Sequence, residues 1–206
     1  VSMIAFSMQD LILEPFAGLI FGMAPGDSTK TVGQFHQGGI LIGMIAAGVG
    51  GSAFAARVAG SLRPWVVGGC LASGAALGML GIAAVKGPPW PLEANLFVLG
   101  LGNGVFAVAA IGSMMGLAGA GETTREGVRM GVWGASQAIA FGLGGLLGAV
   151  GLDLARSILG EIGAAFQLVF AVEAAAFVWA GLLAIKATGA GAISASAREG
   201  KREQFA

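Results

Sequence analysis

The stretch FSMQDLILEPFAG at residues 6–18 places three polar side chains, Gln9, Asp10 and Glu14, in a segment that is otherwise apolar from residue 1 to 24. In the whole chain, 56% of residues are hydrophobic and only 11% are charged, and the mean hydropathy is +0.84. Soluble domains carry about 25% charged residues. The composition therefore predicts an integral membrane protein, and it puts two carboxylates inside a transmembrane helix.

Six apolar runs are long enough to cross about 30 Å of hydrocarbon as α-helices. We expect an all-α transmembrane domain over residues 1–187 and, because the last segment is small, polar and mixed in charge, a disordered cytoplasmic tail over 188–206. The expected spans are 3–23, 32–56, 65–85, 93–117, 127–150 and 163–185. Turn-forming segments predict the connecting loops at 24–30, 57–64, 86–91, 119–127 and 153–161.

The distribution of Lys and Arg predicts the orientation, because positively charged loops are retained on the cytoplasmic side. The loops on the side of the C-terminal tail, together with the tail itself, carry eight Lys and Arg residues, and the loops on the other side carry three. An even number of spans also puts both ends of the chain on one side. We therefore expect a multi-pass protein with both termini in the cytoplasm.

The two acids of the opening stretch lie deep in the first span. Asp10 is near its middle, and Glu14 follows one helical turn later on the same face. A central acid costs roughly 2.5–3.5 kcal/mol on insertion scales. Pro15 removes a backbone donor and leaves the carbonyl of Leu11 without its helical partner, so we expect a kink near residues 11–15.

The last span contains a further acid, Glu173, halfway along residues 163–185. Because no Lys or Arg lies deep in any span, compensation must come from protonation, a bound cation or another polypeptide. We expect Gln9, Asp10, Glu14 and Glu173 to form an intramembrane polar site, with Asp10 or Glu14 protonated at neutral pH. In the alternative interpretation, the acids are neutral and only bridge helices through hydrogen bonds.

Small residues recur at four-residue spacing in the fifth span, where they favour close approach of helix backbones. The predicted packing residues are Gly131, Gly134, Ala138 and Gly142. The sequence GLGNG at 100–104 has some likeness to a nucleotide-binding loop, but it follows no predicted strand and lies within an apolar span. We therefore expect helix packing there and no nucleotide.

Residues 6–18, 126–156 and 169–184 resemble the bacteriochlorophyll delivery (PucC/LhaA) family of the major facilitator superfamily. The first stretch is the most specific, because a pair of acids followed by proline is unusual in a membrane helix. Members of that family carry two six-helix halves, and this chain resembles the C-terminal half. We expect either a fragment of a longer protein or a half-length protein that dimerises.

The resemblance implies a membrane protein that assists assembly of light-harvesting complexes by binding or delivering bacteriochlorophyll to antenna polypeptides. It implies no enzymatic activity and places the protein in the bacterial inner, photosynthetic membrane. The implied partners are antenna polypeptides or a reaction-centre antenna complex, with a second copy or the missing N-terminal half covering the remaining face. Neither nucleic acid nor a protein-bound metal is expected. Two alternatives are a proton-coupled secondary transporter of a small solute and a structural subunit of a photosynthetic assembly.

A bacteriochlorophyll carries magnesium, which accepts oxygen or imidazole ligands. His36, the one histidine of the chain, stands at the start of the second span, and Asn103 and Gln137 lie within the fourth and fifth spans. These three side chains are the candidate pigment ligands. Alternatively, His36 is a polar residue at a helix end, and Asn103 and Gln137 bridge helices, which is the interpretation we favour for the latter two.

Overall fold

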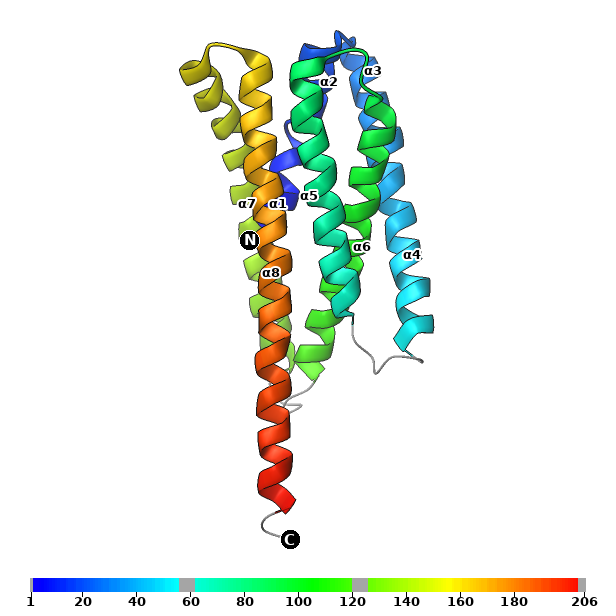
Figure 1. Ribbon diagram of the computed structural model, residues 1–206, viewed down its shortest axis with the longest axis vertical. Helices are drawn as coiled ribbons and strands as arrows, with labels where there is room; N and C mark the ends of the chain where they lie inside the picture. Colours follow the sequence, from blue (N-terminus) through cyan, green and yellow to red (C-terminus); the bar gives the residue numbers. More distant parts are fainter. Residues whose placement is uncertain (1, 56–61, 120–125, 204–206) are drawn as a thin grey trace.

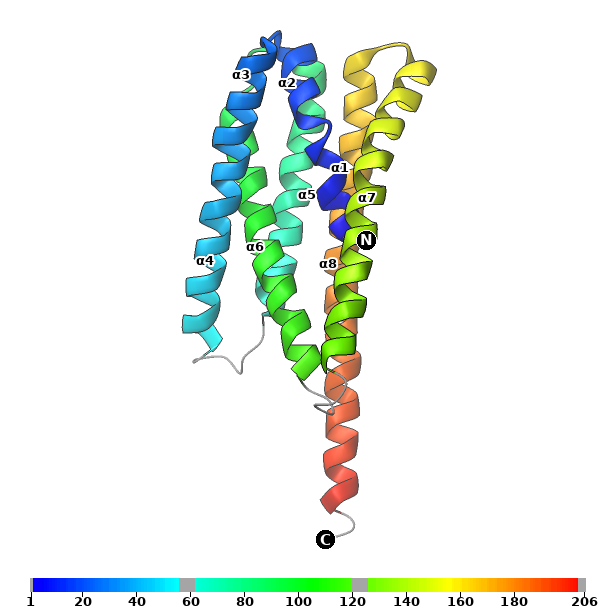
Figure 2. The same ribbon diagram turned by 180° about the vertical axis from the view of Figure 1, so that it is seen from behind.

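The structure, a computed structural model, describes residues 2–55, 62–119 and 126–203, and in these ranges it contains helices and no strand. The spans run alternately up and down in one bundle, with α1 and α2 rising together and α3 continuing into α4 (Figures 1 and 2). The long helices are α4 (Gly38–Ala55), α5 (Arg63–Lys86), α6 (Leu92–Gly119), α7 (Glu126–Leu159) and α8 (Ile162–Glu203). The predicted all-α membrane fold is confirmed.

Five helical segments of the described residues are long and apolar enough to cross a membrane, and a sixth is obtained if α1 (Ser2–Asp10) and α2 (Leu13–Phe21) form one bent span. The two short helices meet at 47° across Leu11 and Ile12. This break confirms the predicted kink near Pro15. Large apolar side chains point outward on the long helices, for example Val49 on α4 and Trp179 on α8, as expected for surfaces that face lipid.

The second span begins earlier than the sequence predicts. Residues 24–30 form no loop: α3 (Pro25–Thr31) continues through a π-helical turn, η1 (Val32–Gln37), into α4. Proline is well suited to the first turn of a helix, where its missing N–H is not needed, and Asp27 and Lys30 complement the helix dipole at the two ends of α3. The apolar span is therefore Pro25–Gly51 and not 32–56.

The predicted loop at 153–161 is also wrong, because α7 continues to Leu159 and turns only at Gly160, which has a φ of 72°. The helix extends beyond its apolar part, and its last turns carry the charged residues Asp153 and Arg156. The predicted loops 57–64 and 119–127 fall largely outside the described residues. Helix geometry in α8 continues to Glu203, through most of segment 188–206, for which a disordered tail was predicted.

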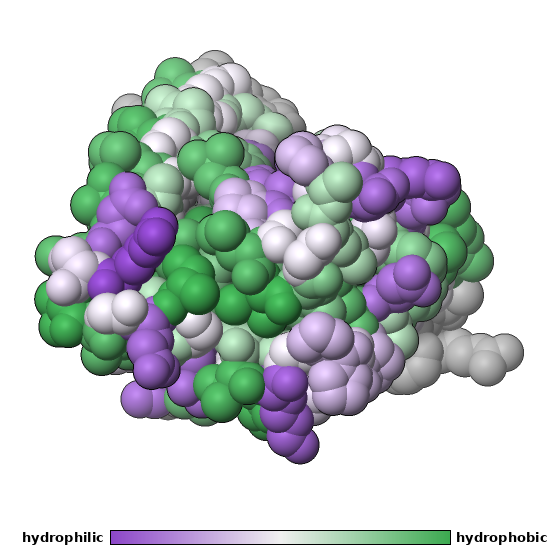
Figure 3. Space-filling view, turned by 90° about the horizontal axis from the view of Figure 1, so that it is seen from above, coloured by the Kyte–Doolittle hydropathy of each residue, from purple (hydrophilic) through white to green (hydrophobic). Residues whose placement is uncertain are grey.

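Figure 3 looks down on the end of the bundle that carries α2, α3 and the α7–α8 turn, where hydrophilic side chains lie among hydrophobic ones. Between the ends, the core is almost entirely apolar and is dominated by phenylalanine. Phe16 of α2 packs edge-on against Phe166 and Phe170 of α8, with ring centroids 5.2 and 5.0 Å apart. This aromatic contact fixes α2 against α8 and so positions the polar residues that precede it in α1.

Candidate functional site

The intramembrane polar residues lie around the break between α1 and α2. Gln9 and Asp10 end α1, and the amide of Ile12 donates to the carbonyl of Gln9 in the turn that follows. Pro15, on the first turn of α2, has no N–H to donate to the carbonyl of Leu11. The local sequence therefore breaks the helix where the polar side chains stand.

Two of these residues are fully enclosed by protein. Gln9 and Glu173 are both 0% exposed. Among the described residues, none makes a hydrogen bond with either carboxylate oxygen of Glu173 or with either amide atom of Gln9. A buried polar group without a partner costs about 1–3 kcal/mol. Within the described residues, the polar atoms of Gln9 and Glu173 are therefore unsatisfied.

The two acids of the opening stretch have different neighbours. Asp10 follows the buried Gln9 at the end of α1, and α1 packs against α8, the helix that carries Glu173. Glu14 is exposed and accepts a hydrogen bond of 3.1 Å from Thr29 of α3. Asp10 thus ends the helix that packs against α8, whereas Glu14 belongs to the contact between α2 and α3. Gln9, Asp10 and Glu173 form what we call the acid site.

A second buried polar group joins three helices and is fully partnered. Asn103 of α6 accepts a 2.8 Å hydrogen bond from Ser73 of α5. Its amide nitrogen lies 3.2 Å from Nε2 of His36, in η1, and donates to it when that nitrogen is unprotonated. All three residues are at most 1% exposed. His36 therefore lies inside the bundle and not at a helix end, and Asn103 bridges helices. Gln137, on α7, is half-buried.

Glycines bring the helices of this polar bridge unusually close together. A Cβ atom at Gly100 would overlap the backbone carbonyl of His36, and one at Gly104 would overlap that of Ile40. Reciprocally, Gly39 and Gly43 of α4 face the backbone of α6. Helix packing was the prediction for residues 100–104. In the structure, the glycines of this GLGNG segment let the backbones of α4 and α6 touch.

On α7 the packing glycines are not those the sequence indicates. Gly131, Gly134 and Gly142 have open space around the position of a Cβ atom, and Ala138 is exposed. Instead, Gly144 and Gly148 face the backbone of α1, and Ser7 of α1 donates a 2.8 Å hydrogen bond to the carbonyl of Phe141. Within the chain, the contact is thus displaced along α7. A contact of the four predicted residues with another polypeptide stays a prediction.

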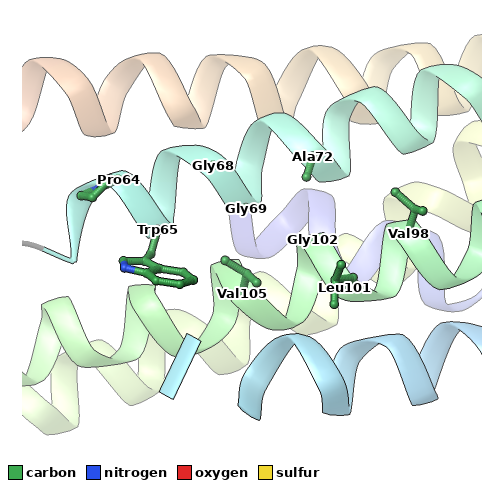
Figure 4. A pocket seen from close by; sticks show the side chains of 9 residues that line it. All are labelled: Pro64, Trp65, Gly68, Gly69, Ala72, Val98, Leu101, Gly102 and Val105. Carbon is green, nitrogen blue, oxygen red and sulfur yellow. The ribbon is translucent and has the colours of Figure 1, made fainter. Parts of the chain in front are cut away.

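An apolar groove opens on the outer surface between α5 and α6, with a volume of about 460 Å³ (Figure 4). The indole ring of Trp65 stands at one end of it, and the exposed Gly68 leaves open space beside it, whereas Gly69 and Gly102 are buried where α5 and α6 touch. The lining residues are Pro64, Trp65, Gly68, Gly69, Ala72, Val98, Leu101, Gly102 and Val105. The sequence interpretation missed this groove, although the adjacent Gly68 and Gly69, one turn after a tryptophan, are a signal for it.

Comparisons with known proteins relate this chain to one family of proteins. The family model described as PUCC protein matches residues 1–191. The chain is 49% identical over 183 residues to the "Bacteriochlorophyll synthase 44.5 kDa chain" of Rhodobacter capsulatus, a match covering 89% of this chain and 41% of that relative. It is 33% identical to "Protein PucC" of the same species and 30% identical to "Protein PucC" of Cereibacter sphaeroides, covering 36% of each. The chain thus spans less than half of these relatives. No solved structure matches it significantly.

Proposed function

The chain belongs to the PUCC protein family, and on that basis we propose that it assists assembly of light-harvesting complexes by binding bacteriochlorophyll and delivering it to antenna polypeptides. The observation that carries this proposal is the groove between α5 and α6, which is apolar and opens on the outer surface of the bundle. One relative is named as a bacteriochlorophyll synthase chain. We propose a binding and delivery role for this chain and no catalysis.

The groove suits a flat apolar ligand for three physical reasons. Its volume falls within the 300–1,000 Å³ typical of small-molecule pockets. Gly68 has open space around its Cβ position, so it leaves room for a planar ring on the α5 wall. The indole of Trp65 offers an aromatic face for stacking. A bacteriochlorophyll is larger than the groove, so part of it would remain in contact with lipid or with a receiving polypeptide.

The groove provides no side-chain ligand for magnesium, because none of its lining residues carries an imidazole, a carboxylate or an amide. His36 was expected to serve this purpose, but its Nε2 is engaged by Asn103 inside the bundle. We therefore propose that the pigment is held through its apolar faces. Weak, apolar binding suits a delivery protein, because the magnesium then stays available to a ligand from the antenna polypeptide.

The partners and the orientation belong to the same proposal. The antenna polypeptides, or a reaction-centre antenna complex, receive the pigment in the bacterial inner membrane, and another polypeptide covers the open glycines of α7. Both termini lie in the cytoplasm.

A cysteine in place of Asp27, which is exposed at the start of α3, should be labelled by a membrane-impermeant reagent only from the periplasmic side. Labelling from the cytoplasmic side would reverse the proposed topology.

Pigment titration into the purified protein in mild detergent tests the groove. Gly68→Leu places a large side chain in the groove, and Gly68 has open space around its Cβ position, so the fold should tolerate it. We expect the affinity for bacteriochlorophyll to fall at least about tenfold, equivalent to about 1.4 kcal/mol.

Gly78→Leu is the matched control, because Gly78 lies on the same helix, also has open space and does not line the groove. This variant should bind as the unmodified chain does. Equal affinities of the Gly68→Leu and Gly78→Leu variants would remove the groove from the proposal.

A further inference from the structure

The acid site, formed by Gln9, Asp10 and Glu173, is separate from the groove and has a chemistry of its own. Glu173 and Gln9 are both fully buried, and in the described part of the chain their polar side-chain atoms have no hydrogen-bond partner. Folded proteins satisfy nearly all such groups, so each exception calls for an explanation. Gln9 and Glu173 are two such exceptions, and they lie on the neighbouring helices α1 and α8, so a single explanation should account for both.

The aromatic contact sets the two helices in register and brings these residues to the same level. Phe16 packs against Phe166, and α1–α2 runs antiparallel to α8 (Figures 1 and 2). Gln9 precedes Phe16 by seven residues across the break, and Glu173 follows Phe166 by seven residues, roughly 10 Å along α8. Both side chains belong to the buried faces through which α1 and α8 pack.

No positive charge of the described helices is placed to neutralise Glu173. The helices packed around α8 are α1, α2, α5 and α7. On α5 the charged residues are Arg63 and Lys86 at its two ends, and α7 has no charged residue between positions 130 and 152. The acids on α1 and α2 are Asp10, at the end of the helix that packs against α8, and Glu14, which is hydrogen-bonded to Thr29. The facing charge is therefore a second carboxylate.

We propose that Glu173 and Asp10 form a proton-binding site in the membrane-spanning bundle, with the amide of Gln9 as its third polar group. A proton bound to a carboxylate oxygen of Glu173 removes one of two facing negative charges. It also provides an O–H donor, which the amide oxygen of Gln9 or the carboxylate of Asp10 can accept. Asp10 is exposed at the surface of the described bundle, so a proton can reach Glu173 through Asp10 where that surface meets water.

The position of the site next to a helix break gives the proton a mechanical effect. When Asp10 and Glu173 are both ionised, their charges repel each other across the contact between α1 and α8. The 47° break at Leu11 and Ile12 lets α1 move without displacing α2, which stays fixed by Phe16. Binding of the proton therefore holds α1 against α8, and its release frees α1.

Infrared spectroscopy of the intact chain in detergent at neutral pH tests this proposal, because a protonated carboxyl group absorbs separately from carboxylates. We expect a protonated-carboxyl band that disappears in Glu173→Gln. The matched control is Glu93→Gln, which removes an exposed acid at the start of α6 and should leave the band unchanged. Asp10→Lys should also abolish the band, because an ammonium group beside Glu173 lets that carboxylate ionise.

Two outcomes would overturn the proposal. One is a band that persists in Glu173→Gln or in Asp10→Lys, since the proton would then lie elsewhere. The other is a band that is absent in sodium chloride and present in choline chloride, which would assign the site to a sodium ion. If Glu173→Gln does not fold, Asp10→Lys carries the test. The groove plays no part in this measurement, so the proton site and the pigment proposal can fail separately.

Discussion

Two buried polar groups of this bundle, the bridge of His36, Asn103 and Ser73 and the acid site, are built in opposite ways. In the bridge, Asn103 joins both partners by hydrogen bonds, and the surrounding helices touch through glycines. In the acid site, Gln9 and Glu173 are equally buried but unsatisfied by the described residues. The difference indicates that the bridge stabilises the fold, whereas the acid site is held ready for a component from outside the chain.

The glycine contact next to the bridge should be the most sensitive part of the molecule. Gly100→Ala places a methyl group on the backbone carbonyl of His36, which cannot move without displacing the helix. Overpacking of this kind costs typically about 1–3 kcal/mol, and backbone contact puts it at the upper end. Thermal unfolding in detergent should show a large fall in Tm.

Gly78→Ala is the control for this substitution, because it has open space and gains roughly 1 kcal/mol of helix propensity. An unchanged Tm in Gly100→Ala would mean that α4 and α6 do not touch as described.

Asn103→Leu should have the next largest effect, because it leaves Ser73 and His36 buried without their common partner. An unsatisfied buried group costs about 1–3 kcal/mol. Denaturant titration of the variant should therefore show clear destabilisation. The double variant Asn103→Leu, Ser73→Ala should recover part of the loss, since one unsatisfied group is removed again. Independent, additive losses would argue against the bridge.

Glu173→Leu tests the other half of the comparison and should have the opposite sign. Because this carboxyl has no hydrogen-bond partner to lose among the described residues, replacing it with an apolar side chain of similar size should leave stability unchanged or raise it. The same experiment as for Asn103→Leu measures it. Destabilisation as large as that of Asn103→Leu would mean that Glu173 is a structural residue and that the two regions do not differ.

The smallest effect on the isolated chain is expected at Gly134, on the outer face of α7. Gly134→Leu meets open space and should leave Tm nearly unchanged, whereas Gly148→Leu, which faces the backbone of α1, should lower it. Crosslinking in native membranes then asks whether Gly134→Leu reduces association with other polypeptides. A large fall in Tm for Gly134→Leu would place this face inside the chain's own packing.

The sequence predicts well the features that depend on composition and on single unusual residues. The apolar spans follow from hydropathy, and the kink follows from Pro15, because no neighbour alters the missing N–H. The burial of Glu173 follows from its place in an apolar helix. By contrast, the span boundaries at Pro25 and Leu159 were misjudged, because polar residues on a helix end outside the hydrocarbon look the same in sequence as a loop.

It was harder to predict which residues of a helix contact a neighbouring helix. Gly131, Gly134, Gly144 and Gly148 share a helix and a four-residue spacing, but only the latter two meet α1, and spacing does not say which face has a neighbour. His36 was placed at a helix end because α3 was taken for a loop, whereas it lies about three turns into the span. The groove depends on two helices at once, so the signal from Trp65, Gly68 and Gly69 on α5 indicates only one of its walls.

The most direct test of the account is the absorption spectrum of the protein purified in mild detergent from cells that make bacteriochlorophyll. The account predicts that the chain co-purifies with the pigment, and that Gly68→Leu loses it while Gly78→Leu retains it at equal protein abundance. A spectrum without pigment for the unmodified chain, or equal pigment in both variants, would contradict the central claim that the groove between α5 and α6 binds bacteriochlorophyll.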